Sequence, residues 1–186
     1  MKNPFLIGKT IYLRAPEAGD EEMHAVSENH PDPRRTLYYA IPTSLQQQWD
    51  KIQKAVHDPH TTMFTICRRV DDIPIGTTSL VRIDWIGRMA IFYLAIAGKE
   101  NWSLGYGREI TRMMIEYAFS TLNLNRIQLH VSMENEAAIK VYRETGFIIE
   151  GTLRQAMFYD NHYIDFYVMG ILKGDWKGKE DPESAG

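Results

Sequence analysis

Apolar and polar side chains follow a strand-like spacing through the first half of the chain. Short segments rich in β-branched and aromatic residues are separated by turn-forming sequences such as residues 71–74. This spacing predicts strands over residues 11–14, 63–70 and 75–83. An uninterrupted apolar run over residues 89–97 predicts a further strand that is buried on both faces.

Two helices are expected among these strands. Asp20 begins a segment with acidic residues in its first turn, which predicts a helix over residues 21–29 with Asp20 as its cap. Ser44 and Gln47 have the spacing of a capping box, in which each side chain binds the other residue's backbone N–H. The second helix is therefore expected to begin after Ser44 and to end near residue 57.

The spacing becomes helical after two glycines, Gly105 and Gly107. Apolar residues then recur at positions 110, 113, 114, 117 and 118, which predicts an amphipathic helix. Strict alternation over residues 127–132 predicts a strand with one buried face.

The last third of the chain predicts a short helix and a hairpin. Apolar residues over 137–142 indicate the helix, and Gly146 is expected to end it. Two strand-like segments, residues 147–158 and 163–172, flank a turn at positions 160 and 161. The order of elements predicts one mixed α/β domain over residues 1–176, followed by a disordered tail over residues 177–186.

Composition narrows the classes of protein that fit this pattern. The 186 residues carry 21 basic and 24 acidic side chains, a net charge of -3, which argues against nucleic-acid binding. Cys67 is the one cysteine, and the six histidines lack the spacing of metal ligands, so neither a disulfide nor a metal is expected. The chain has no signal peptide and no apolar run of membrane-spanning length, which predicts a cytoplasmic protein without a membrane partner.

The glycine loop between the apolar strand and the amphipathic helix is a candidate anion site. Glycines let the backbone approach a ligand closely, and free N–H groups at a helix start favour a pyrophosphate. The loop lacks the lysine of a Walker sequence and the third glycine of a dinucleotide fingerprint. Two glycines before a helix also suit an ordinary turn.

A second segment begins at Asn135 and ends at Gly146 and Phe147. Taken alone it suits a capped helix, with Asn135 as the cap, Ala138 and Tyr142 as packing residues and Gly146 as the stop. Its combination with the glycine loop is more specific than either segment.

The two segments together resemble the GCN5-related N-acetyltransferase (GNAT) family, in the branch that acetylates ribosomal-protein N-termini and polyamines. The family carries a Gln/Arg-x-x-Gly-x-Gly/Ala loop, matched here by Gly105 and Gly107, with Trp102 at the first position. The resemblance covers residues 91–176 and, more loosely, residues 10–83. It implies a sheet of about seven strands flanked by about four helices and splayed between the fourth and fifth strands.

The resemblance also implies how acetyl-CoA, the cosubstrate, is held. Backbone groups of the splayed strand pair with the pantetheine arm, loop amides hold the pyrophosphate, and Asn135 binds near the pantetheine beside Ala138. The implied cofactor contacts are Leu94, Ala95, Ile96, Leu104, Gly105, Tyr106, Gly107, Arg108, Asn135 and Ala138. Tyr142 is implied as the catalytic acid that protonates the departing thiolate.

The general base is not identified by the resemblance. Related polyamine enzymes place a Glu where this chain has Ile91, and the strand over residues 155–157 has no acid either. The remaining candidates are Tyr93, His130, Ser132, Glu134 or a water chain. Asp165 could anchor a cationic substrate or pair with Arg154, and a covalent route through Cys67 is the least favoured alternative.

The expected function is direct acetyl transfer from acetyl-CoA to a primary amine. A peptide or protein α-amine, or another small amine, is the leading acceptor, and polyamines and aminosugars are alternatives. A catalytically silent CoA-binding module is the alternative of another class, and the family suggests a homodimer. Asp84, Glu134 and Asp165 would favour a polyamine if they converged at the acceptor mouth.

Overall fold

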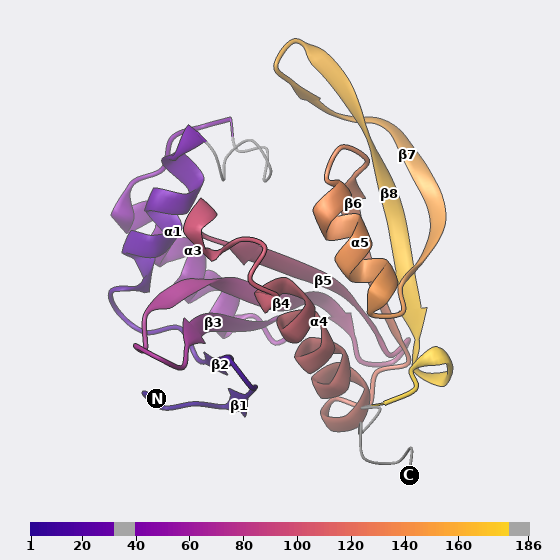
Figure 1. Ribbon diagram of the computed structural model, residues 1–186, viewed down its shortest axis with the longest axis horizontal. Coiled ribbons are helices and arrows are strands. Elements are labelled where there is room, and N and C mark those ends of the chain that lie inside the picture. Colours follow the sequence, from indigo (N-terminus) through magenta and orange to yellow (C-terminus); the bar gives the residue numbers. More distant parts are fainter. Residues whose placement is uncertain (32–39, 179–186) are drawn as a thin grey trace.

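A single mixed sheet organises the protein. The computed structural model describes residues 1–31 and 40–178, and its eight strands follow the order β1-β2-β3-β4-β5-β6-β8-β7 (Figure 1). The strands are β1 (Leu6–Ile7), β2 (Ile11–Arg14), β3 (Thr62–Arg68), β4 (Pro74–Asp84), β5 (Met89–Ile96), β6 (Arg126–Ser132), β7 (Ile148–Tyr159) and β8 (His162–Leu172). The α-helices in the described residues are α1 (Asp20–Asn29), α3 (Leu45–His57), α4 (Tyr106–Glu116) and α5 (Glu136–Glu144).

Most predicted elements are confirmed to within two residues. The additional strand is β1, a two-residue segment that pairs with the edge of β2. The capping box is present, since Gln47 N donates to Ser44 Oγ at 3.2 Å and Ser44 N to Gln47 Oε1 at 2.9 Å. Gly146 ends α5 with a φ of 100°, a conformation that glycine adopts without strain.

The sheet splits between β5 and β6. These strands are parallel and pair only where Met89–Ile91 face Arg126–Gln128, while every other neighbouring pair is antiparallel. Figure 1 shows β7 and β8 running at a steep angle to β3 and β4. Counted without β1, the split lies between the fourth and fifth strands, as expected.

The split also corrects one expectation. Residues 89–97 were expected to be buried on both faces, but Tyr93 is 56% exposed. Strand β6 has diverged at this position, and the main sheet contacts of α1 and α3 are with β4 and β3 respectively. One face of the second half of β5 is therefore left open.

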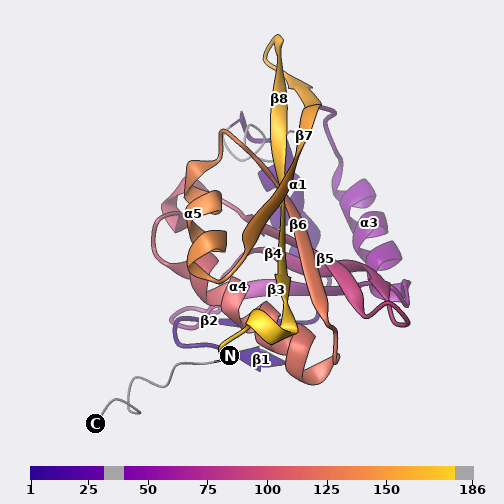
Figure 2. The same cartoon turned by 90° about the vertical axis from the view of Figure 1, so that its right-hand side faces the viewer.

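The hydrophobic core fills the other face. Helices α4 and α5 cover it, whereas α3 lies on the opposite side of the strands (Figure 2). Ile110 and Met114 of α4 are fully buried against Phe92 of β5 and Leu129 of β6 in one continuous cluster. Each such side chain stabilises the fold by about 1.5–3 kcal/mol relative to an exposed one.

A buried ion pair joins the start of α1 to the sheet. Asp20 was expected to cap α1, but the cap is Gly19, and the carboxylate of Asp20 instead binds Arg14 of β2 at 2.7 and 2.8 Å. Thr65 of β3 donates to the same carboxylate at 2.7 Å. Burial alone would raise the pKa of Asp20, but these hydrogen bonds hold it below its ordinary value.

The closing hairpin projects beyond the rest of the sheet (Figure 1). Asp160 and Asn161 form its turn with φ values of 48° and 64°, which confirms the predicted position. Strand β7 bulges between Leu153 and Met157. The predicted domain limit at residue 176 stays a prediction, because residues 179–186 lie outside the described part of the chain.

Candidate active site

The diverging edge of β5 presents unpaired backbone groups. Ala97 N donates to Ile75 O at 2.8 Å, and in an antiparallel pair the residues that bond to the neighbouring strand alternate. Ala95, opposite Thr77, therefore directs its peptide groups toward β4. Leu94 and Ile96 direct theirs toward the split, where β6 no longer pairs with β5. Two of the three residues expected to bind the pantetheine arm thus have backbone groups facing the split.

Trp102 adds a contact that the sequence did not predict. Its indole Nε1 donates to Ile96 O at 3.0 Å, so this side chain lies against the open edge of β5. A tryptophan at the first position of the glycine loop therefore binds the strand carbonyl directly. The signal in the sequence was the departure from the family's Gln/Arg, but its partner could not be inferred.

The glycine loop forms the start of α4 next to this edge. Gly105 precedes the helix with a φ of 85°, and the first-turn amides of Tyr106, Gly107 and Arg108 have no carbonyl one turn earlier to bind. A Cβ atom on Gly107 would lie 3.9 Å from Ile96 and 4.0 Å from Val141, so the loop lies within van der Waals contact of β5 and α5. Free amides at a helix start suit an anionic group.

The side chains around this loop are placed by α5. The side chain of Arg108 forms an ion pair with Glu144 of α5. Leu104, before the helix, is 57% exposed. Asn135 caps α5, since its Oδ1 accepts a hydrogen bond from Ala138 N at 3.1 Å. The capping role expected of Asn135 is thus observed, and Ala138 is partly buried against the core. The amide nitrogen of Asn135 has no partner among the described residues.

Tyr142 lies on the core side of the split. It is 8% exposed, and its ring meets those of Phe92 and Phe147 at centroid distances of 6.2 and 5.8 Å. Its hydroxyl makes no hydrogen bond within the described part of the chain. Burial raises the pKa of Tyr142 to about 12, so the phenol keeps its proton at neutral pH and can donate it.

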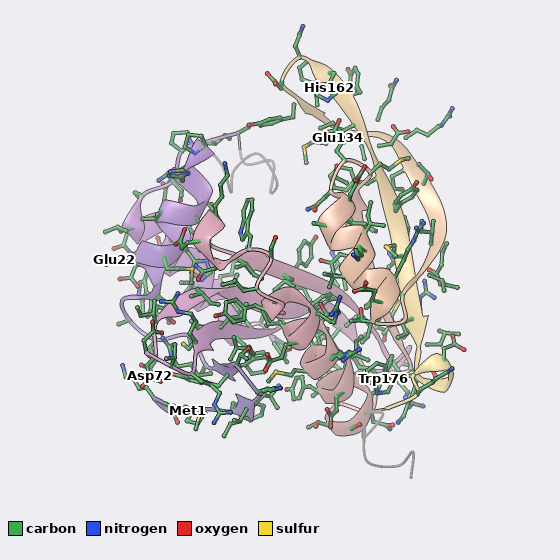
Figure 3. The ribbon with its side chains drawn as sticks, viewed as in Figure 1. Met1, Glu22, Asp72, Glu134, His162 and Trp176 are labelled. Carbon is green, nitrogen blue, oxygen red and sulfur yellow. The ribbon has the colours of Figure 1, made fainter. Side chains whose placement is uncertain are left out.

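Two of the candidate bases, Ser132 and Glu134, form hydrogen bonds near the end of β6, and the other two, Tyr93 and His130, are exposed. Ser132 is buried and its Oγ accepts from Glu134 N at 3.1 Å, while the Glu134 carboxylate binds His162 at 3.0 Å beside the hairpin (Figure 3). Hydrogen bonding to Glu134 raises the pKa of His162. His130 and Tyr93 are exposed, on strands β6 and β5 respectively.

Asp84 and Asp165 do not meet at one acceptor mouth, the condition under which these acids would have favoured a polyamine. Asp165 accepts a hydrogen bond from Gln155 N at 2.7 Å in the β7 bulge, rather than pairing with Arg154. Asp84 accepts from two amides of the β4–β5 turn, at the end of β5 opposite the split. These two acids stabilise local structure at different ends of the sheet.

Cys67 is not placed for covalent chemistry. It is fully buried in β3, opposite Tyr12, and burial raises the pKa of its thiol. A protonated, inaccessible thiol is a poor nucleophile.

Over residues 1–31 and 40–178, no group of three or more His, Cys, Asp or Glu side chains could hold a metal ion. Within the same residues, no helix is long and apolar enough to cross a membrane.

Known proteins are similar to this chain in sequence and in fold. Residues 10–148 match the model of the acetyltransferase (GNAT) domain. The spermidine N(1)-acetyltransferase of Vibrio cholerae is 31% identical over 175 residues, covering 92% of this chain and 98% of that protein. The L-amino acid N-acetyltransferase AaaT of Escherichia coli is 39% identical over 167 residues, covering 88% and 98%.

The fold is shared with the first of these relatives. The crystal structure of the Vibrio cholerae spermidine N-acetyltransferase, in complex with CoA and spermine, matches with a TM-score of 0.82 at 30% identity. The match covers 89% of this chain and 97% of that one. These relatives are named as N-acetyltransferases. The chain therefore belongs to the GNAT acetyltransferase family and is an N-acetyltransferase that transfers an acetyl group to an amine.

Proposed function

We propose that the acetyl donor is acetyl-CoA and that the acceptor is an α-amine, on a free amino acid or a peptide N-terminus. The donor fits the split between β5 and β6. The peptide groups of Leu94 and Ile96 would pair with the pantetheine arm, and the helix-start amides would hold the pyrophosphate. The remaining proposed contacts are Leu104, Gly105, Tyr106, Gly107, Arg108, Asn135 and Ala138.

The acceptor would approach from the open face of the split. The core face is filled by Phe92, Tyr142 and Phe147, whereas Tyr93 on the other face is 56% exposed. The strand pairing places the same-face residues of β4, β5 and β6 together. They are Thr77, Ser79, Val81, Ile91, Tyr93, Ala95, Gln128, His130 and Ser132.

The absence of a carboxylate from this set is the observation that carries the proposal. A polyamine has several ammonium groups, and holding them requires several acidic partners. An α-amine has a pKa about 2 units below that of an alkyl amine, worth about 2.7 kcal/mol in forming the neutral nucleophile. A strand surface without acids at these nine positions suits the less basic amine.

The catalytic step follows from the two faces. The neutral amine attacks the thioester carbonyl, and the Leu94 N–H, directed into the split, would stabilise the oxyanion. As the C–S bond breaks, Tyr142 on the core face would give its proton to the thiolate. With a pKa of about 12, Tyr142 is protonated at neutral pH and has this proton to give.

Two relatives favour different acceptors. The Escherichia coli protein AaaT, named an L-amino acid N-acetyltransferase, supports the α-amine. The Vibrio cholerae structure, which contains spermine with CoA, makes a polyamine the second candidate.

Steady-state kinetics with four kinds of acceptor distinguish the candidates. We expect amino acids or short peptides with free N-termini to give a higher kcat/KM than spermidine or glucosamine at pH 7.5. A peptide with a blocked N-terminus and a free lysine is the control, and it should be a poor acceptor. Spermidine turned over faster than every α-amine would overturn the proposal and favour the second candidate.

A further inference from the structure

Two side chains flank the point where β5 and β6 separate. The last paired residues are Ile91 and Gln128, so the next residues on the same face are Tyr93 of β5 and His130 of β6. Both are exposed, on the face that α4 and α5 do not cover. Any amine entering from this face would meet them before it reached the strand edge at Leu94.

Gln128 supports the imidazole of His130. The two Nε2 atoms lie 3.1 Å apart, and the side chains are two residues apart on the same face of β6. A carboxamide has an N–H donor at one end and an oxygen acceptor at the other, so after rotation it can bind either protonation state of the ring. The neighbour of His130 on β8 is Val168, which cannot form a hydrogen bond through its side chain.

We propose that His130 is the base that takes the proton from the acceptor amine, and that Gln128 is the residue that positions its ring. The inference rests on the proposed placement of the thioester in the split. It puts the base and the acid on opposite faces of the sheet, with His130 beside the entering amine and Tyr142 beside the leaving sulfur. An imidazole is among the few side chains that accept a proton near neutral pH.

His130 and Tyr142 together account for every proton that moves in the reaction. For Nδ1 of His130 to be the free acceptor, the neutral ring carries its proton on Nε2, and the Gln128 carboxamide is rotated so that its oxygen binds that N–H. The acceptor ammonium then gives one proton to Nδ1. The nitrogen electron pair forms the C–N bond, the C–S bond breaks, and the Tyr142 proton moves to the sulfur. The second proton lost by the nitrogen restores Tyr142 through solvent, and His130 releases its proton to solvent.

The other candidate bases are less suited to this role. Ser132 is buried, and the carboxylate of Glu134, two residues after the end of β6, is paired with His162. Tyr93 faces the same region, but a phenol takes up a proton only after it has been ionised, which is costly at neutral pH. Val168 lies opposite His130 on β8, and the nearest charged group along the same face of β6 is Arg126, which approaches Gln128 Oε1 at 3.4 Å and forms an ion pair with Glu150.

The test is His130→Asn, with the best acceptor of the wild-type enzyme. We expect kcat/KM at pH 7 to fall by about 10²-fold, while the calorimetric affinity for acetyl-CoA stays unchanged. The loss should shrink to about fivefold or less above pH 9, where an α-amine is already deprotonated. Added imidazole should restore part of the activity of His130→Gly. His60→Asn, on a surface histidine that binds Ile83 O, is the matched control.

Gln128→Leu tests the positioning role. It should reduce kcat more than KM and leave the pH dependence intact, because the base itself remains. A His130→Asn enzyme with a loss below threefold, or an equal loss at every pH, would overturn the inference. Failure of the wild type to prefer α-amines would instead count against the proposed acceptor, since the His130 test can use any amine that is turned over.

Discussion

The chemistry at the scale of single residues depends on where each side chain is buried. Tyr142 is enclosed by two phenylalanine rings, and this raises its pKa to about 12. The ring packing and the hydroxyl have separate functions, because the ring stabilises the core whereas the hydroxyl has no partner in the described structure. A substitution that removes only the hydroxyl therefore isolates the proposed acid.

Tyr142→Phe should lower kcat by about 10²-fold, the size of a general-acid contribution, without weakening acetyl-CoA binding. The measurement is single-turnover acetylation, which reports the chemical step. Tyr117→Phe is the control, because Tyr117 is also a buried core tyrosine with a raised pKa but packs near Phe5 and Phe64. A Tyr142→Phe enzyme within twofold of the wild type would remove this residue from the mechanism.

At the scale of elements, β5 has two functions in succession. Its first half completes the sheet with β6, and its second half leaves one edge unpaired. Trp102 binds the Ile96 carbonyl on this edge, so a pantetheine arm that paired with this carbonyl would compete with the indole. The strand thus provides both the continuity of the sheet and the binding surface.

Amide hydrogen exchange can detect this division within β5. Without ligand, the N–H groups of Leu94 and Ile96 should exchange quickly, and saturating acetyl-CoA should slow them by at least about tenfold. Ala95, which pairs with Thr77, should be protected in both states and serves as the internal control. Unchanged rates at Leu94 and Ile96 in the saturated enzyme would show that the arm binds elsewhere.

At the scale of the whole molecule, the helical layer of α1 is joined to the sheet by few polar contacts. The Arg14–Asp20 pair is the buried one, with side chains 7% and 4% exposed. Removing one partner of a buried pair leaves the other charge without compensation, which costs about 3–5 kcal/mol. The pair therefore links the α1 layer to β2 and β3.

Asp20→Asn should lower the free energy of unfolding at pH 7 by about 3 kcal/mol, measured in urea. Because the folded-state pKa of Asp20 is lowered, its stabilisation is fully present above about pH 4. It is lost as the pH falls from there through the folded-state pKa, so the two proteins should converge in acid.

Asp71→Asn is the matched control for this experiment. It breaks an ion pair with Arg68 whose side chains are 35% and 23% exposed, and a surface pair contributes about 1 kcal/mol or less. An Asp20→Asn protein as stable as Asp71→Asn at pH 7 would show that the buried pair does not hold the layers together.

Sequence and tertiary structure determine different features of this protein. The spacing of apolar residues determined the strands, the helix α4 and the hairpin turn, because period and turn chemistry act between residues close in the chain. The capping box at Ser44 and Gln47 was predictable for the same reason. The resemblance to known acetyltransferases depended on two motifs that are equally local.

Only the tertiary structure decided which groups face the split. The partner of Asp20 is Arg14, with Thr65 added from a strand 45 residues away, and no local pattern specifies that distance. The directions of the Leu94, Ala95 and Ile96 peptide groups follow from pairing with β4 and from the departure of β6. The open face beside Tyr93 and His130 exists because helices cover one side of the split and not the other, and such coverage is a property of packing between distant segments.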